Sequence, residues 1–168
     1  MNIRNKSLKP FFAAMVAAVV LGGIGALALW SGSPWLFPSL GPTIAIQANS
    51  PDLNIAKPWN VMAGHIVGLF AGVLAVYLAG AFNAPVFNAT HILAGSRVIA
   101  AVLAILFSMS VQHVLKADHP PAQATTLLVA LGALPASGSG MVTVLTGVVF
   151  LAVAGEAVRR LFSERRVE

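Results

Sequence analysis

The sequence predicts an all-α integral membrane protein with four transmembrane helices and two short, proline-led half-helices that re-enter the membrane. Of the 168 residues, 58% are hydrophobic and 9% are charged, and the mean hydropathy is +0.86. Soluble domains carry roughly a quarter charged residues, so there is too little charge here to cover a soluble surface. Cysteine is absent, which excludes disulfides and thiolate metal sites.

The formal net charge of +5 comes mainly from the two ends of the chain. Basic residues beside apolar spans are typical of cytoplasmic loops, and here they do not indicate nucleic-acid binding. We therefore expect both termini in the cytoplasm, and the membrane to be a bacterial inner membrane. The apolar run at 13–30 is longer than the core of a usual signal peptide, so we interpret it as a helix. The basic residues are Arg4, Lys6, Lys9, Arg159, Arg160, Arg165 and Arg166.

Four apolar runs are long enough to cross a bilayer, which takes roughly 20 residues in a helix. Two windows without Lys, Arg, Asp or Glu, at 10–51 and 119–155, are too long for one crossing each. Each window therefore holds a second, shorter piece, at 37–46 or 119–135, that proline or glycine interrupts. The four crossings are expected at about 11–30, 59–82, 97–115 and 141–158.

The basic residues between the crossings leave two topologies open. Segment length favours four crossings with two re-entrant helices, which places Arg97 inside and both Lys57 and Lys116 outside. With six crossings, the two lysines fall inside and Arg97 outside, and both schemes satisfy the positive-inside rule. In either scheme Arg97 heads a crossing, where we expect its side chain to reach the lipid headgroups.

The chain forms a single domain whose two halves, 8–82 and 90–160, share one plan. Each half has a crossing, a short proline-led segment, a loop and a second crossing. Laying 37–43 on 119–125 matches a proline followed five residues later by a threonine. Matching interruptions in two halves indicate a transporter binding site.

The second short segment predicts an anion site at the start of a helix. Proline is tolerated in the first turn because no N–H is needed there. The N–H groups that remain free and the positive dipole end then favour an anion. Alternatively, His119 only caps the helix and Thr125 bonds the carbonyl four residues back. The predicted residues are His119, Pro120, Pro121, Ala122, Gln123 and Thr125.

Ser39, Gly41 and Thr43 surround the corresponding break in the first half. Gly41-Pro42 suggests a helix start with exposed N–H groups, where a small residue allows close approach. A tight turn at the membrane interface is the alternative. We predict that these three residues also contact the substrate.

Asn60 and His65 complete the predicted site on the second crossing, on one helix face with Gly64. An ionisable side chain inside a membrane helix is costly and is therefore a functional candidate. The structural alternative is a neutral histidine bonded to another helix.

Other kinds of site find no support in the residues. There is no nucleophile–base pair, phosphate loop or carboxylate dyad, so we expect no enzyme, no catalytic residue and no cofactor. The histidines lack the spacing of metal ligands, and the spans lack the acids of a carboxylate proton relay. Gly64, Gly68 and Gly72 form a stripe that lets helices pack closely, within the protomer or between protomers of a homo-oligomer.

Three blocks of this sequence resemble the HPP family of small integral membrane proteins. They are His119-Pro120-Pro121 with the alanine-rich stretch after it, residues 38–43, and residues 57–60 followed by Gly64-His65. Their order and spacing cover about 8–160. The sequence departs at Pro42, where a small residue is common, and at Gln123, where glycine is common, which affects the predicted anion site.

The resemblance implies four membrane segments and, for plant-plastid and cyanobacterial relatives, nitrite transport. Some relatives carry C-terminal regulatory domains, and we expect none here. We therefore predict a transporter or channel for a small inorganic anion, most of all nitrite, with the lipid bilayer and further copies of the chain as its partners. The alternative is a non-transporting membrane subunit whose glycine stripe binds a partner. A membrane enzyme ranks third.

Overall fold

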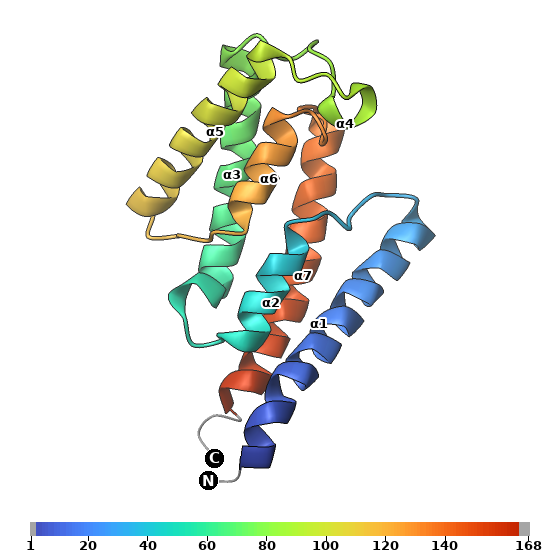
Figure 1. The fold of residues 1–168 in the computed structure, drawn as a ribbon, viewed down its shortest axis with the longest axis vertical. Coiled ribbons are helices and arrows are strands. Elements are labelled where there is room, and N and C mark those ends of the chain that lie inside the picture. Colours follow the sequence, from blue (N-terminus) through green and yellow to red (C-terminus); the bar gives the residue numbers. More distant parts are fainter. Residues whose placement is uncertain (1–2, 165–168) are drawn as a thin grey trace.

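The computed structural model describes residues 3–164, and these form helices and loops without any strand (Figure 1). Four helices are long and apolar enough to cross a membrane, at Pro10–Ser31, Pro58–Leu78, Gly95–Val114 and Gly138–Ser163. The prediction of an all-α membrane protein with four long spans is therefore confirmed. The corresponding helices are α1 (Ile3–Ser31), α3 (Pro58–Leu78), α5 (Gly95–Val114) and α7 (Gly138–Glu164).

Two short helices, α2 (Leu40–Asn49) and α6 (Ala122–Ala130), lie between the long ones. They have 10 and 9 residues, so each is about 14 Å long, roughly half of a bilayer core. α6 begins directly after the proline pair and ends before Gly132, which adopts φ +84°. A four-residue helix, α4 (Phe87–Thr90), and a 3₁₀ turn, η1 (Asn54–Ala56), lie in the connections.

The chain reverses direction between each of these six helices and the next (Figure 1). α1, α3 and α6 run one way, and α2, α5 and α7 run the other way. The loop between α2 and α3 therefore lies at the end of the bundle that holds both termini. There, Arg159 Nη1 donates to the Pro51 carbonyl at 3.3 Å. The connection between α5 and α6 lies toward the same end, since Asn60 Nδ2 donates to the Asp118 carbonyl at 3.0 Å.

These directions do not support the predicted re-entrant arrangement. A re-entrant segment returns to the side from which it came, whereas α2 runs back toward the end where α1 begins, and α3 then runs in the same direction as α1 (Figure 1). The shared direction of α1 and α3 agrees with the six-crossing alternative, although α2 and α6, with 10 and 9 residues, are each too short to cross a bilayer as helices. In that alternative, Lys57 and Lys116 share one side of the membrane and Arg97 lies on the other. The second half runs through the bundle in the opposite sense to the first.

α3 occupies the centre of the bundle and contacts α5, α6 and α7. Its glycine stripe packs on α6. A Cβ at Gly68 would lie 2.6 Å from Thr126 Oγ1, and one at Gly72 would lie 2.9 Å from Val129 Cβ. The predicted packing role of the stripe is correct within the protomer. Since α6 occupies this face, the first of the two predicted uses of the stripe, packing within the protomer, is the one that the structure shows.

Apolar packing holds the remaining helices in place. Leu40 and Ile44 of α2 are buried with Leu151 of α7, whereas small side chains such as Ala104 and Ala130 fill the space among α3, α5 and α6. Large apolar side chains cover the outside, as expected for a surface that faces lipid. Examples are Leu29, Tyr77, Val102 and Val153, each more than half exposed.

Candidate functional site

His65 lies at the centre of a polar cluster where the two short helices meet. Its Nδ1 is 2.8 Å from Thr125 Oγ1 on α6, and its Nε2 is 3.2 Å from Thr43 Oγ1 on α2. Ser39 Oγ, at the N-cap of α2, lies 2.7 Å from Thr125 Oγ1 and links the two helices directly. All four side chains are fully buried. Residues far apart in the sequence thus form one connected network.

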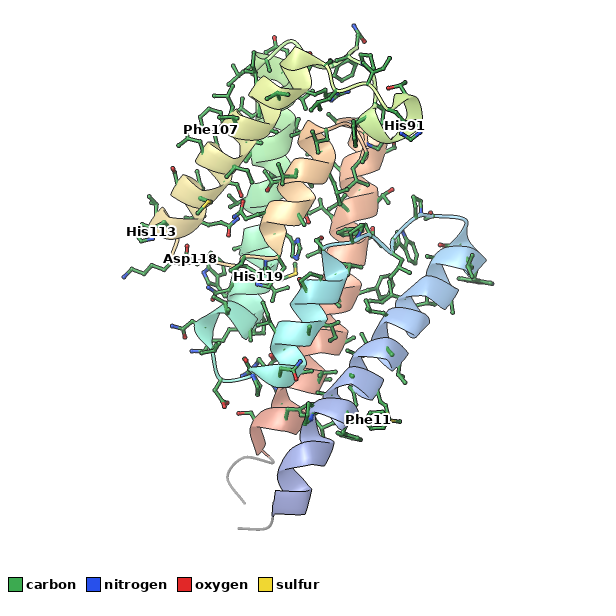
Figure 2. The ribbon with its side chains drawn as sticks, viewed as in Figure 1. Phe11, His91, Phe107, His113, Asp118 and His119 are labelled. Atoms are coloured by element: carbon green, nitrogen blue, oxygen red, sulfur yellow. The ribbon has the colours of Figure 1, made fainter. Side chains whose placement is uncertain are left out.

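His119 is the second imidazole of this cluster and is 1% exposed. Its Nε2 lies 3.0 Å from Thr43 Oγ1, and its Nδ1 lies 2.8 Å from the Ile55 carbonyl oxygen. The two imidazole rings are 5.1 Å apart at an interplanar angle of 61°. Figure 2 shows His119 in the interior beside α2, whereas His91 and His113 lie on the outside of the bundle.

When both rings are neutral, one arrangement of donors and acceptors satisfies both nitrogens of each ring. A carbonyl oxygen only accepts, so His119 Nδ1 donates to Ile55 and Nε2 must accept. The Thr43 hydroxyl then donates to His119, and His65 Nε2 donates to the Thr43 oxygen. His65 Nδ1 is left to accept from the Thr125 hydroxyl. The cluster is therefore one directed chain of hydrogen bonds.

Thr43 offers a second arrangement, because its hydroxyl has two acceptors at the same distance. The Ser39 carbonyl oxygen and His119 Nε2 both lie 3.0 Å from Thr43 Oγ1. If the hydroxyl donates to Ser39, the bond between His119 and Thr43 is kept only when His119 donates from both ring nitrogens, which makes the ring cationic. Rotation of a single hydroxyl thus allows the cluster to hold one additional proton.

Ser108, Gln112 and Thr126 extend the cluster toward α5. Gln112 Nε2 donates to Ser108 Oγ at 2.9 Å, and its Oε1 accepts from the His119 backbone N–H at 3.1 Å. Thr126 Oγ1 lies 3.2 Å from Ser108 Oγ. Sequence reasoning missed Ser108 and Gln112. The available signal was two polar residues four apart, and so on one face, in an otherwise apolar helix.

The other predicted residues lie around the cluster without joining it. Asn60 bonds the Asp118 carbonyl and so holds the loop that precedes the prolines. Gly41 has no role in close packing, because a Cβ there would meet nothing within 4 Å. Pro120 is exposed, Pro121 and Ala122 are buried, and Gln123 is half-buried, with no hydrogen-bond partner for its Oε1.

The prediction of free N–H groups at the start of α6 is wrong. The N–H groups of Ala122, Gln123 and Ala124 donate to carbonyl oxygens three residues back, at 2.9–3.1 Å. The two prolines before them have no N–H, so the first turn bonds itself. Donors for an anion must therefore come from side chains, and α6 contributes its dipole.

The sequence predicted that the Arg97 side chain reaches the lipid headgroups. Instead it is buried in the bundle, with 4% of its surface exposed. Its Nη1 and Nη2 donate to carbonyl oxygens of the chain. Within the described residues, no group of three His, Asp or Glu side chains could hold a metal ion.

The tripeptide His119-Pro120-Pro121 thus stands at the junction of the two short helices. A sequence profile described as "HPP, transmembrane region" matches residues 3–168. The chain belongs to the HPP family. The search of curated proteins found no match, and neither did the search of solved structures.

The tripeptide that gives the HPP family its name has two separable roles in this chain. The histidine places an imidazole against Thr43 of the other half. The prolines start α6 without N–H groups that would need partners in the interior. This division explains why the polar residue and the two prolines occur side by side.

Proposed function

We propose that this HPP protein is a membrane transporter or channel for a small inorganic anion, with nitrite as the first substrate to test. The observation that carries the proposal is the buried cluster where α2 and α6 meet, each near its N-terminus. The positive ends of two helix dipoles thus face one polar cluster. In transporters with broken helices, such ends face the anionic groups of the substrate.

Side-chain hydroxyl and imidazole groups would hold the anion. The hydroxyls of Ser39, Thr43 and Thr125 rotate and can each donate a hydrogen bond. In the structure these hydroxyls bond one another and the two imidazoles, so binding of an anion would replace some of these bonds with bonds to the anion. The side chains of Asp52, Asp118 and Glu156, the carboxylates that the structure describes in full, take no part in the cluster.

We further propose that a proton accompanies the anion at His119. The groups that face this ring are Thr43 from α2, His65 from α3 and the Ile55 carbonyl, whereas Gln112 from α5 accepts from the backbone N–H of His119. None of them is a carboxylate, so a proton on His119 would have no fixed counterion and would attract the anion. Anion influx should therefore increase as the external pH falls.

The membrane orientation belongs to the same proposal. Arg159, in the last part of α7, donates to the Pro51 carbonyl in the connection between α2 and α3, and the same connection carries Lys57, so basic residues gather at that end of the bundle. This distribution supports a cytoplasmic location for that end, by the positive-inside rule, in a bacterial inner membrane. We also propose a homo-oligomer, since so few helices make a thin wall for a pathway. Its contact face must differ from the buried glycine stripe.

The test is influx into liposomes that contain the purified protein and no other. Nitrite influx should exceed influx of nitrate, formate and chloride, and should be faster at the lower of two external pH values. Empty liposomes and liposomes with heat-unfolded protein are the controls. No flux of any anion from folded protein would refute the proposal and favour a membrane subunit without transport activity.

A further inference from the structure

Arg97 lines a cavity of about 220 Å³ at the end of the bundle opposite the termini. The cavity lies between the loop after α3 and the loop after α6, which approach each other at that end (Figure 1). Phe82 and Val86 line it from the first loop, and Gly132 and Ser137 line it from the second. This cavity is separate from the histidine cluster, none of whose residues line it.

The guanidinium of Arg97 is buried but only partly bonded. Nη1 donates to the Ala130 carbonyl at 3.3 Å, and Nη2 donates to the Ala84 carbonyl at 2.9 Å. Nε has no partner among the described residues. Arginine has five N–H donors, so most of its hydrogen-bonding capacity is not used by the chain.

The charge of Arg97 also lacks a counterion in the described part of the chain. The three ion pairs found there are His113 with Asp118, and Glu156 with Arg159 and with Arg160. The Ala130 carbonyl belongs to the last turn of α6, where the helix dipole is negative, and offsets part of the charge. Burial of a guanidinium without an opposite charge is costly, so an anion in the cavity would stabilise it.

Gly132 shows that the backbone is shaped around this side chain. With φ at +84°, it adopts a conformation that residues other than glycine rarely adopt. A Cβ there would lie 2.7 Å from Arg97 Nη2 and 2.8 Å from its Cζ. The guanidinium therefore lies directly against the backbone at one wall of the cavity.

We infer that the Arg97 cavity is a second anion-binding site, for a small monovalent inorganic anion. A volume of 220 Å³ equals that of roughly seven waters at about 30 Å³ each, enough for a small oxoanion with part of its hydration shell. Thr125 of the cluster and Ala130, whose carbonyl Arg97 bonds, lie five residues apart on α6, so about 8 Å of helix separates the two sites. The evidence for this site is the cavity and the partly bonded guanidinium, and it does not depend on the proposed function. A role for the site in binding the anion before or after transport does rest on the proposed function.

The test is calorimetric titration of the purified protein with sodium nitrite, at an ionic strength held constant with sodium gluconate. Arg97→Gln retains hydrogen-bond donors and removes the charge, so it should weaken binding at this site at least tenfold. Arg97→Lys retains the charge and should bind more tightly than Arg97→Gln. Thermal unfolding of each variant checks that it folds.

Phe82→Glu provides a test that does not alter the buried arginine. Phe82 lines the cavity and is 63% exposed, so a carboxylate there would reach the cavity at little cost to folding. It should repel nitrite or pair with Arg97 and weaken binding at least tenfold. Phe87→Glu adds the same charge nearby at an exposed position that does not line the cavity, and should leave binding within twofold of the wild type.

The outcomes separate this inference from the proposed function. Nitrite binding that Arg97→Gln and Phe82→Glu both weaken supports the site, even if liposomes show no flux. Unchanged affinity and stoichiometry in both variants overturns the site, even if the wild-type protein transports nitrite. Absence of nitrite binding to the wild type also overturns it.

Discussion

Thr43→Val should remove the connection between the two imidazoles and destabilise the bundle. The Thr43 oxygen lies 3.2 Å from His65 Nε2 and 3.0 Å from His119 Nε2, and it is fully buried. Valine has the shape of threonine and leaves no cavity, so the change isolates the hydrogen bonds. Two interhelical bonds at about 0.6–1.7 kcal/mol each give a loss of about 1–3 kcal/mol in the free energy of unfolding.

The assay is reversible unfolding of the purified protein in mixed detergent–SDS micelles, followed by circular dichroism. Thr143→Val is the matched control, because the Thr143 hydroxyl bonds only the Ser139 carbonyl of its own helix, at 3.0 Å, and is exposed. We expect the control to change the free energy of unfolding by less than about 0.5 kcal/mol. Equal effects of the two substitutions would show that the cluster does not hold the short helices together.

Three further predictions concern packing, protonation and the terminal end. Gly68→Ala should cost about 1–3 kcal/mol of stability by overpacking against Thr126, whereas Gly22→Ala, where a Cβ meets nothing within 4 Å, should not destabilise; unfolding in mixed micelles measures both. His119→Gln replaces the imidazole by an amide that still forms hydrogen bonds but does not titrate, so it should abolish the rise of nitrite influx at low external pH, and a retained rise would place the proton elsewhere. Glu156→Gln should lower stability by about 1–3 kcal/mol, because the mostly buried Glu156 side chain accepts from Arg159 at 2.6 Å and also pairs with Arg160; an unchanged free energy of unfolding would contradict this expectation.

The sequence predicted the long helices correctly because their signal is local. Uninterrupted apolar runs bounded by Pro58 or Gly138 are read from composition and length alone. The short helix after Pro121 was predicted for the same reason, since proline and Gly132 set its two ends. The directions of the short helices were not predicted correctly. Segment length alone does not tell whether a short helix returns to the side from which it came or continues across the bundle.

The site was predicted in composition but not in connectivity. Ser39, Thr43, His65, His119 and Thr125 were all named, because each is a polar residue in an apolar context or beside a proline break. Their hydrogen bonds join residues 22 to 86 positions apart, and only the packing of the helices shows which partners meet.

Two predictions were wrong because they assumed the wrong surroundings, one for the N–H groups at the start of α6 and one for the Arg97 side chain. The N–H groups of Gln123 and its neighbours were expected to be free, but tight bonds to carbonyl oxygens three residues back satisfy them. Arg97 was expected at the lipid surface because most arginines at helix ends extend there. Its burial depends on a left-handed residue, Gly132, far along the chain. No pattern near Arg97 signals that contact.

The central claim is that the cluster around His65 lies on the path of the anion. The most direct measurement is the rate of nitrite influx into liposomes that contain equal amounts of folded wild-type, Thr125→Val or Thr143→Val protein. Thr125 Oγ1 lies 2.8 Å from His65 Nδ1, so loss of the hydroxyl should reduce influx at least tenfold, while Thr143→Val should match the wild type. Equal influx through all three proteins would contradict the claim and place the path elsewhere in the bundle.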